Sequence, residues 1–236
     1  MNQYINQAQA VDASFTSEAT RKFLLNVYNW MAMGLAITGV IAWGVAGSEF
    51  SMTLATNPVL YFGLFIVQLG IVFGLSAAID RIPSGVAIGA FFLYSALTGL
   101  TFSILFLVFA GASIASTFFI CAGMFASVSV FGYVTKKDLS KLGTYLFMAL
   151  IGLIIASVVN IFLKSPMMNW IISLAGVLIF TGLTAHDTQK IKKMSQVTEF
   201  DSEQGKKAAV LGSLTLYLDF INLFMFLLNF LGNRRD

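Results

Sequence analysis

Seven long apolar segments, separated by short polar or turn-forming stretches, make up most of this chain. Each is about 20 residues or longer, the length that a helix needs to cross the hydrocarbon core of a bilayer. The segments cover residues 24–47, 56–79, 85–109, 112–134, 142–163, 167–189 and 208–231. Their apolar runs are continuous, whereas strands of a membrane barrel alternate apolar and polar residues. Because backbone groups in lipid must pair within their own segment, the pattern predicts an all-α integral membrane protein with seven transmembrane helices.

The composition supports the same class of protein. Hydrophobic residues make up 58% of the chain and charged residues 11%, against about 45–50% and about 25% in soluble domains. A polar tail, residues 1–22, precedes one seven-helix transmembrane domain, residues 23–233. The formal net charge is +3, but the basic residues are scattered between apolar segments. The composition therefore predicts the lipid bilayer as a partner and gives no reason to expect nucleic acid.

The basic residues predict the orientation of the chain in the membrane. They lie mainly on alternate connections: Arg21 and Lys22; Arg81; Lys136, Lys137 and Lys141; Lys190, Lys192, Lys193, Lys206 and Lys207. The positive-inside rule then places the N-terminus in the cytoplasm. Seven full spans would put Arg234 and Arg235 outside. That conflict leaves open whether the last apolar segment is an ordinary span.

Asp219 is a carboxylate near the middle of the last apolar segment. An aspartate at a helix centre costs about 2.5–3.5 kcal/mol on insertion scales. It shares one helical face with Gly212, Thr215, Asn222 and Asn229, while the other faces are apolar. The stripe predicts that this side of the helix faces protein or water, and that Asn222 supports a polar path.

Asp187 lies at the end of the sixth apolar segment, and two interpretations of it are open. It can form an interfacial ion pair with Lys190, three residues later. Alternatively, it faces Asp219 on the next helix. Two close carboxylates resist double ionisation, so such a pair can hold a shared proton near neutral pH. The same two groups could also bind a transient Ca²⁺ ion.

The other polar residues have simpler interpretations. Arg81 is either a loop charge beside Asp80 or a counter-charge that reaches one of the carboxylates. Gln68 and Asn160 are expected to form interhelical hydrogen bonds more than a site. His186 is the only histidine, which excludes paired haem ligands and a His-rich zinc site. Its position beside Asp187 leaves open a part in pH response.

Three segments carry a resemblance to a known family. They are "TKKDLSKLG" at 135–143, "HDTQKIK" at 186–192 and "LYLDFINLF" at 216–224. Together they resemble the Bax inhibitor family, whose bacterial branch is named for YccA, and their order and spacing match from about residue 20 onward. The resemblance implies seven helices, with the last surrounded by the other six. It also implies a bacterial inner (plasma) membrane protein.

The resemblance further implies what the polar residues do. Asp187 and Asp219 correspond to a carboxylate pair thought to share a proton and act as a pH-sensitive latch on a calcium leak path. Arg81 corresponds to a basic residue that can pair with one of them. Many members carry a glutamate where this chain has Gln68, which removes a charge there.

Three functions follow as hypotheses. The first is a pH-sensitive Ca²⁺ (cation) leak with Ca²⁺ and protons as ligands and no tightly bound cofactor. The second is an interaction protein that modulates a membrane-bound AAA protease, with the polar tail as the contact. The third, an intramembrane enzyme, is disfavoured: neither Asp187 nor Asp219 lies in a GxGD motif, and no GxSxG occurs.

Overall fold

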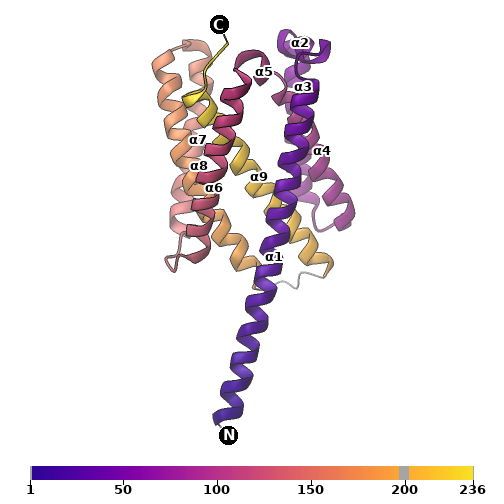
Figure 1. Ribbon diagram of the computed structural model, residues 1–236, viewed down its shortest axis with the longest axis vertical. Coiled ribbons are helices and arrows are strands. Elements are labelled where there is room, and N and C mark those ends of the chain that lie inside the picture. The colour runs from indigo at the N-terminus through magenta and orange to yellow at the C-terminus, as the bar shows by residue number, and fades with distance from the viewer. Residues whose placement is uncertain (1, 197–201, 236) are drawn as a thin grey trace.

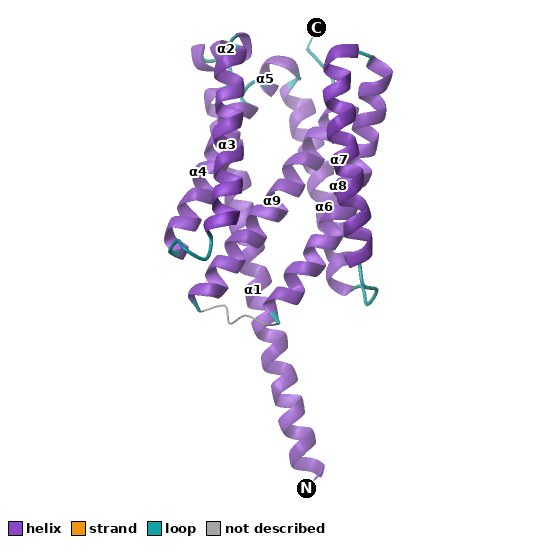
Figure 2. Ribbon diagram, turned by 180° about the vertical axis from the view of Figure 1, so that it is seen from behind, coloured by secondary structure: helices purple, strands orange, loops and turns teal. Residues whose placement is uncertain are grey.

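The computed structural model describes residues 2–196 and 202–235, with side chains from residue 18 onward. Its helices are α1 (Asn2–Val45), α2 (Glu49–Thr56), α3 (Pro58–Ala78), α4 (Ser84–Phe102), α5 (Leu105–Val108), α6 (Gly111–Val134), α7 (Ser140–Leu163), α8 (Pro166–Ser195) and α9 (Glu203–Leu231). Figure 2 shows the described residues as helices joined by loops. In the described part of the chain, the one bridge between extended residues joins Phe109 and Arg234.

Seven helical segments among the described residues are long and apolar enough to cross a membrane: Glu18–Val45, Pro58–Ala78, Ser84–Val108, Gly111–Val134, Ser140–Leu163, Pro166–Ser195 and Glu203–Leu231. The predicted class, an all-α integral membrane protein with seven spans, is therefore confirmed. The last of them, α9, has 29 residues, which corresponds to about 44 Å of helix at 1.5 Å per residue. It is long enough to be a full span.

Helix α9 lies at the centre of the bundle, as predicted. It packs against α1, α4, α6 and α8, whereas α3 packs mainly on α4 and α7 mainly on α8. Figure 1 shows α9 running diagonally between the two groups of helices. The enclosure by six helices thus has two shells: four helices contact α9 extensively, and α3 and α7 lie outside them. The large exposed apolar side chains of α3 and α7 suit helices that face lipid.

Two local features depart from the predicted segments. The first connection contains a short helix, α2. Ser48 caps its start, because the Ser48 side chain accepts a hydrogen bond from the Ser51 backbone. The third span is interrupted after Phe102. There the Ser103 hydroxyl donates to the Leu100 carbonyl over 2.7 Å, and such side-chain bonds compete with the helical ladder.

Side-chain caps mark the starts of three other long helices, and a left-handed residue marks the end of one. Asn57, Ser165 and Ser202 cap the starts of α3, α8 and α9 through their side chains. Lys164, at φ 49°, ends α7 in the left-handed region. Asn160, a predicted polar support, accepts a hydrogen bond from the Ser165 backbone at 3.1 Å. It therefore holds the tight α7–α8 turn.

The polar tail, predicted as residues 1–22, is the first part of α1, which is helical from Asn2. Figure 1 shows this part projecting beyond the bundle at the end opposite to the C-terminus. Glu18 and Lys22 form an i,i+4 ion pair at 3.1 Å on its exposed surface.

Candidate functional site

Asp219 is buried at the contact between α9 and α8. Its side chain is 5% exposed, and its Oδ2 atom has no hydrogen-bond partner among the described residues. The carboxyl group of Asp187, on α8, lies within interaction range of it. The structure therefore brings together the two acids that the sequence singled out, on adjacent antiparallel helices.

Asp187 has a second neighbour. Its Oδ1 atom lies 2.9 Å from Nδ1 of His186, and the side chains are 14% and 22% exposed. Lys190 is exposed, and the described residues show no ion pair between it and Asp187. Of the two interpretations of Asp187, the geometry favours contact with Asp219. The arrangement is a row of three titratable groups that leads from the partly exposed His186 to the buried Asp219.

Helix α7 holds the His186 ring in place. Gly143, near the start of α7, is buried against this ring, and a Cβ atom at position 143 would collide with it. The absence of a side chain at Gly143 is therefore what lets α7 approach the ring. Gly143 ends the "TKKDLSKLG" segment, so its place in the motif has a steric reason.

The end of α8 is fastened to the α6–α7 connection. Gln189 accepts a hydrogen bond from the Leu139 backbone at 2.9 Å and donates one to the Lys137 carbonyl at 2.8 Å. Lys193 pairs with Asp138 at 2.7 Å. Two of the segments that carry the family resemblance, 135–143 and 186–192, are thus docked on each other. This docking fixes the part of α8 that carries Asp187.

The exposed ion pair also changes the acidity of Asp138. The hydrogen bond from Lys193, then those from Ser140, lower the pKa of the Asp138 carboxyl to about 2. This carboxylate is therefore ionised throughout the physiological range.

The side of α9 that faces α1 and α4 carries a second polar network, which sequence analysis missed. The Tyr217 hydroxyl lies 2.6 Å from Thr38 Oγ1, which donates to the Ser95 carbonyl at 2.8 Å. The Ser213 hydroxyl donates to the Val27 carbonyl at 3.0 Å. Isolated hydroxyl residues in otherwise apolar segments were the available signal. These bonds fix α9 against α1 and α4, opposite the carboxyl pair.

The remaining predicted residues lie away from the pair or serve packing. Gln68 is buried and donates to the Leu97 carbonyl at 3.1 Å and to Thr101 Oγ1 at 2.6 Å, so it joins α3 to α4. Asn222 is partly buried and donates to the Leu218 carbonyl of its own helix. Arg81 is exposed in the α3–α4 turn. The described residues give it no ion pair, so the structure does not bring it to either carboxylate.

The oxygen ligands at this site are few. Within the described parts of the chain, no group of three or more His, Cys, Asp or Glu side chains is placed to hold a metal ion. A pocket of about 300 Å³ beside His186 is lined by Ser140, Gln189, Lys190 and Lys193. Its basic lining does not suit a resident cation. Any cation at the carboxyl pair would be held weakly.

The fold and site define a polytopic α-helical membrane protein with a buried carboxyl pair between its last two helices. Its sequence matches the family described as Inhibitor of apoptosis-promoting Bax1 over residues 20–236. The chain therefore belongs to the Bax inhibitor family, as the three motifs predicted.

Several bacterial relatives align along nearly their whole length. The chain is 52% identical to the inner membrane protein YbhL of Escherichia coli over 215 residues, which cover 90% of this chain and 92% of the relative. It is 46% identical to an uncharacterised Borreliella burgdorferi protein over 216 residues, 91% and 93% of the two chains. An uncharacterised Rickettsia prowazekii protein, RP147, is 44% identical over 227 residues, 93% and 92% of the chains.

Proposed function

We propose that this protein is a pH-sensitive leak for a cation, with Ca²⁺ as the permeant ion and Asp187 and Asp219 as the gate. The observation that carries the proposal is the buried Asp219 carboxyl, which contacts the Asp187 carboxyl on α8 and whose Oδ2 atom has no other hydrogen-bond partner among the described residues. Burying a charged carboxylate in a membrane span costs free energy, and ionisable groups inside membrane spans commonly mark ion or proton pathways.

The gate would work through electrostatic repulsion. When Asp187 and Asp219 share one proton, a hydrogen bond holds α8 to α9 and the path is shut. When both are ionised, two negative charges in a poorly solvated site repel each other and separate the helices. His186, beside Asp187, exchanges protons with the solvent side of the pair. Arg81, which is exposed and has no ion pair among the described residues, has no part in the proposed gate.

The scarcity of ligands fits passage better than storage. Ca²⁺ in tight sites takes about six to eight oxygen ligands, and this pair offers far fewer. Conduction requires an ion to bind weakly enough to leave. We therefore propose transient binding at the pair, no tightly bound cofactor and no catalytic role.

The test is Ca²⁺ flux into proteoliposomes between pH 5 and 8, with the native chain and with Asp219→Asn. The native chain should conduct more as pH rises and the shared proton is lost. Asp219→Asn, which can hydrogen-bond to Asp187 without a proton, should remove most of this pH dependence.

Asp80→Asn is a matched control because Asp80 is an exposed aspartate of the α3–α4 turn. It should leave the profile unchanged. Flux that is absent at every pH, or that keeps its pH profile when both Asp187 and Asp219 are replaced, would overturn the proposal.

A second candidate function is modulation of a membrane-bound AAA protease. The projection of α1 beyond the bundle supports it, since a helix that leaves the membrane domain offers a contact surface (Figure 1). The E. coli relative is named an inner membrane protein, so we place this chain in the inner membrane of a bacterium, with its N-terminus in the cytoplasm. Deletion of residues 2–17 should then change the turnover of protease substrates without changing Ca²⁺ flux.

A further inference from the structure

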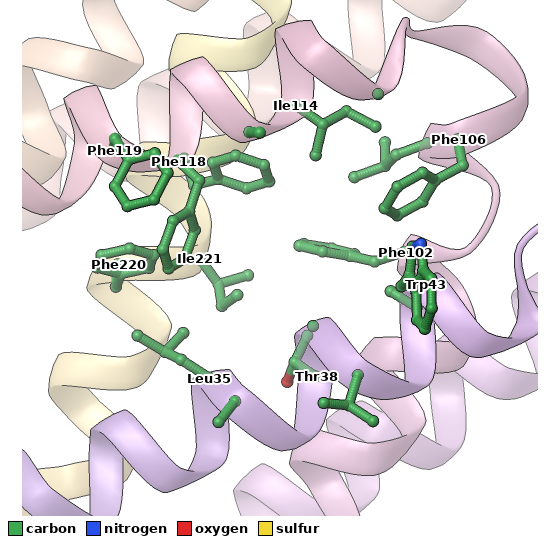
Figure 3. A pocket seen from close by; sticks show the side chains of 18 of the residues that line it. Leu35, Thr38, Trp43, Phe102, Phe106, Ile114, Phe118, Phe119, Phe220 and Ile221 are labelled. Atoms are coloured by element: carbon green, nitrogen blue, oxygen red, sulfur yellow. The ribbon is translucent and has the colours of Figure 1, made fainter.

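A large apolar cavity lies in the half of the bundle farther from the N-terminus. Its volume is about 760 Å³, within the range of about 300–1,000 Å³ typical of ligand pockets. Residues of α1, α4, α5, α6 and α9 line it, and Figure 3 shows Phe102, Phe118 and Phe220 around it. Almost all of these side chains are aromatic or aliphatic. The carboxyl pair is not part of the lining.

The cavity opens sideways, where a bilayer would be. Three of its lining residues are among the most exposed apolar side chains: Val40 and Trp43 on α1, at 69% and 74%, and Phe119 on α6, at 73%. They belong to membrane-spanning segments. An apolar space that opens at this depth is filled by hydrocarbon, because an empty one would forfeit its packing contacts.

A segment with two arginines lies next to one end of the cavity, although neither arginine is part of its lining. The C-terminal segment follows the α5–α6 connection: the Ala110 backbone donates to the Asn233 carbonyl at 3.1 Å, and the Arg235 backbone N–H donates to the Val108 carbonyl at 2.9 Å. The Arg234 guanidinium lies 6.0 Å from the Phe109 ring centroid. Leu105, Phe106 and Gly111, on either side of this connection, line the cavity.

Arg234 and Arg235 are exposed and have no ion pair among the described residues. They are the two basic residues that conflict with the predicted orientation, since seven spans place them on the outer side. A lipid phosphate at this interface would be a partner for them. Asp236 follows them in the sequence, so the side chains of this segment carry a net charge of +1, and replacing both arginines changes it to −1.

We propose that the cavity binds one phospholipid of the bilayer, with an acyl chain between α1 and α6 and an anionic headgroup beside Arg234 and Arg235. The apolar lining selects hydrocarbon but not the lipid class. The arginines supply the preference for anionic headgroups. The site is separate from the proposed gate, and its test involves no ion transport.

The first experiment fills the cavity. Gly39 lines it, and a Cβ atom at this position meets nothing within 4 Å, so the side chain of Gly39→Leu starts in open space at the cavity wall. Native mass spectrometry of the detergent-purified chain would measure binding of phosphatidylglycerol and of phosphatidylcholine with the same acyl chains. Gly39→Leu should weaken the binding of both lipids.

Gly44→Leu is the matched control. Gly44 lies on the same helix with equally open space, but it does not line the cavity, so lipid binding should match the native chain. Melting temperatures would confirm that both variants fold. Binding to Gly39→Leu that equals binding to Gly44→Leu would overturn the proposed location.

The second experiment removes the headgroup contacts. Arg234→Gln with Arg235→Gln should weaken phosphatidylglycerol binding by roughly fivefold per arginine, since one basic residue near an anionic surface contributes about 1 kcal/mol. Phosphatidylcholine carries the same phosphate but a net neutral headgroup, so its binding should fall less than that of phosphatidylglycerol. Lys164→Gln, in the α7–α8 turn, is the control for loss of a single positive charge elsewhere. Equal binding of the two lipids by the native chain would overturn the headgroup assignment.

A photoactivatable acyl chain on phosphatidylglycerol then locates the site. Crosslinked peptides should contain the α6 residues Ile114 and Phe118, which line the cavity. The outer faces of α3 and α7 should be labelled only in proportion to bulk lipid. Labelling confined to those outer faces would contradict the proposal.

Discussion

The two sides of α9 differ sharply at the level of Asp219. Toward α8, the carboxyl pair lies in a tightly packed region, and the end of α8 is hydrogen-bonded to the α6–α7 connection. Toward α1 and α6, the next residues, Phe220 and Ile221, line an apolar cavity of about 760 Å³. One region holds its polar groups in close packing, while the other leaves a space lined by apolar side chains. A single helix separates them.

This difference in packing indicates where α9 has space beside it and where it has none. The polar region is fixed by close backbone approach, since Gly132 of α6 lies against the Ala185 backbone of α8. The cavity side offers room for α9 to shift. Between the two lie three aromatic rings. The Phe118 ring centroid is 5.5 Å from that of Phe220 and 6.3 Å from that of Phe224. On the proposed function, the described conformation is the shut one, because an ion beyond Asp219 would meet these rings.

The largest expected effect comes from placing the same methyl group in each region. In Gly132→Ala the new Cβ would collide with the Ala185 backbone, which cannot turn away as a side chain can. Overpacking of this kind costs about 1–3 kcal/mol. In Gly39→Ala the methyl enters open space, and alanine favours a helix by roughly 0.5–1 kcal/mol over glycine. The melting temperature should fall for the first variant and rise slightly for the second.

Gly123→Ala controls for the helix, because Gly123 also lies on α6 and has open space around it. It should behave like Gly39→Ala. If Gly132→Ala melted at the native temperature, the α6–α8 contact would not be tight, and the contrast between the two regions would disappear.

The sequence predicted the spans and singled out Asp219 because both follow from strong one-dimensional signals, whereas the contact with Asp187 was one of two open interpretations that the family resemblance favoured. Apolar runs of about 20 residues set the number of helices, and an aspartate within such a run is costly enough to mark a site. The interruption after Phe102 was not predictable in this way. It depends on a single hydroxyl, Ser103, competing for a backbone carbonyl, while the surrounding residues remain apolar.

Relations between distant segments were harder to predict. Nothing local indicates that Gln189 would bond to the backbone at Lys137 and Leu139, or that Tyr217 would meet Thr38. The composition of α9 did not separate its cavity-lining residues, Phe220 and Ile221, from those packed on other helices, because all are apolar. Such features depend on which helices pack together, and the periodicity of apolar residues in one sequence does not show this.

A smaller effect is expected on the cavity side of α9. Tyr217 is fully buried, and its hydroxyl contacts Thr38, which also lines the cavity. Tyr217→Phe keeps the ring and its edge contacts with Phe91 and Tyr94 but removes the hydrogen bond. Hydrogen bonds between membrane helices contribute about 0.6 kcal/mol on average and up to about 1.7, so the melting temperature should fall modestly.

Tyr145→Phe is the control for Tyr217→Phe, since Tyr145 is exposed on the outer helix α7 and its loss of a hydroxyl should leave melting unchanged. Equal shifts for the two variants would mean that the Thr38 contact does not hold α9 against α1. The hydroxyl contact would then have no part in fixing the cavity side of α9.

The smallest effect belongs to the exposed edge of the polar region. Asp138 and Lys193 pair at 2.7 Å, but both side chains are largely in solvent, where such pairs contribute little and salt screens them. The hydrogen bond from Lys193 lowers the pKa of Asp138 from 3.8 to about 2. The pair therefore adds stability above the unfolded-state pKa of 3.8 and loses it as pH falls toward 2.

Asp138→Asn should lower the melting temperature slightly and equally between pH 5 and 8, and the difference should shrink below about pH 4 and in high salt. Asp80→Asn, without an ion pair among the described residues, should show no such pH dependence. A loss as large as that of Gly132→Ala would mean that this ion pair, and not close packing and the Gln189 hydrogen bonds, holds α8 in place.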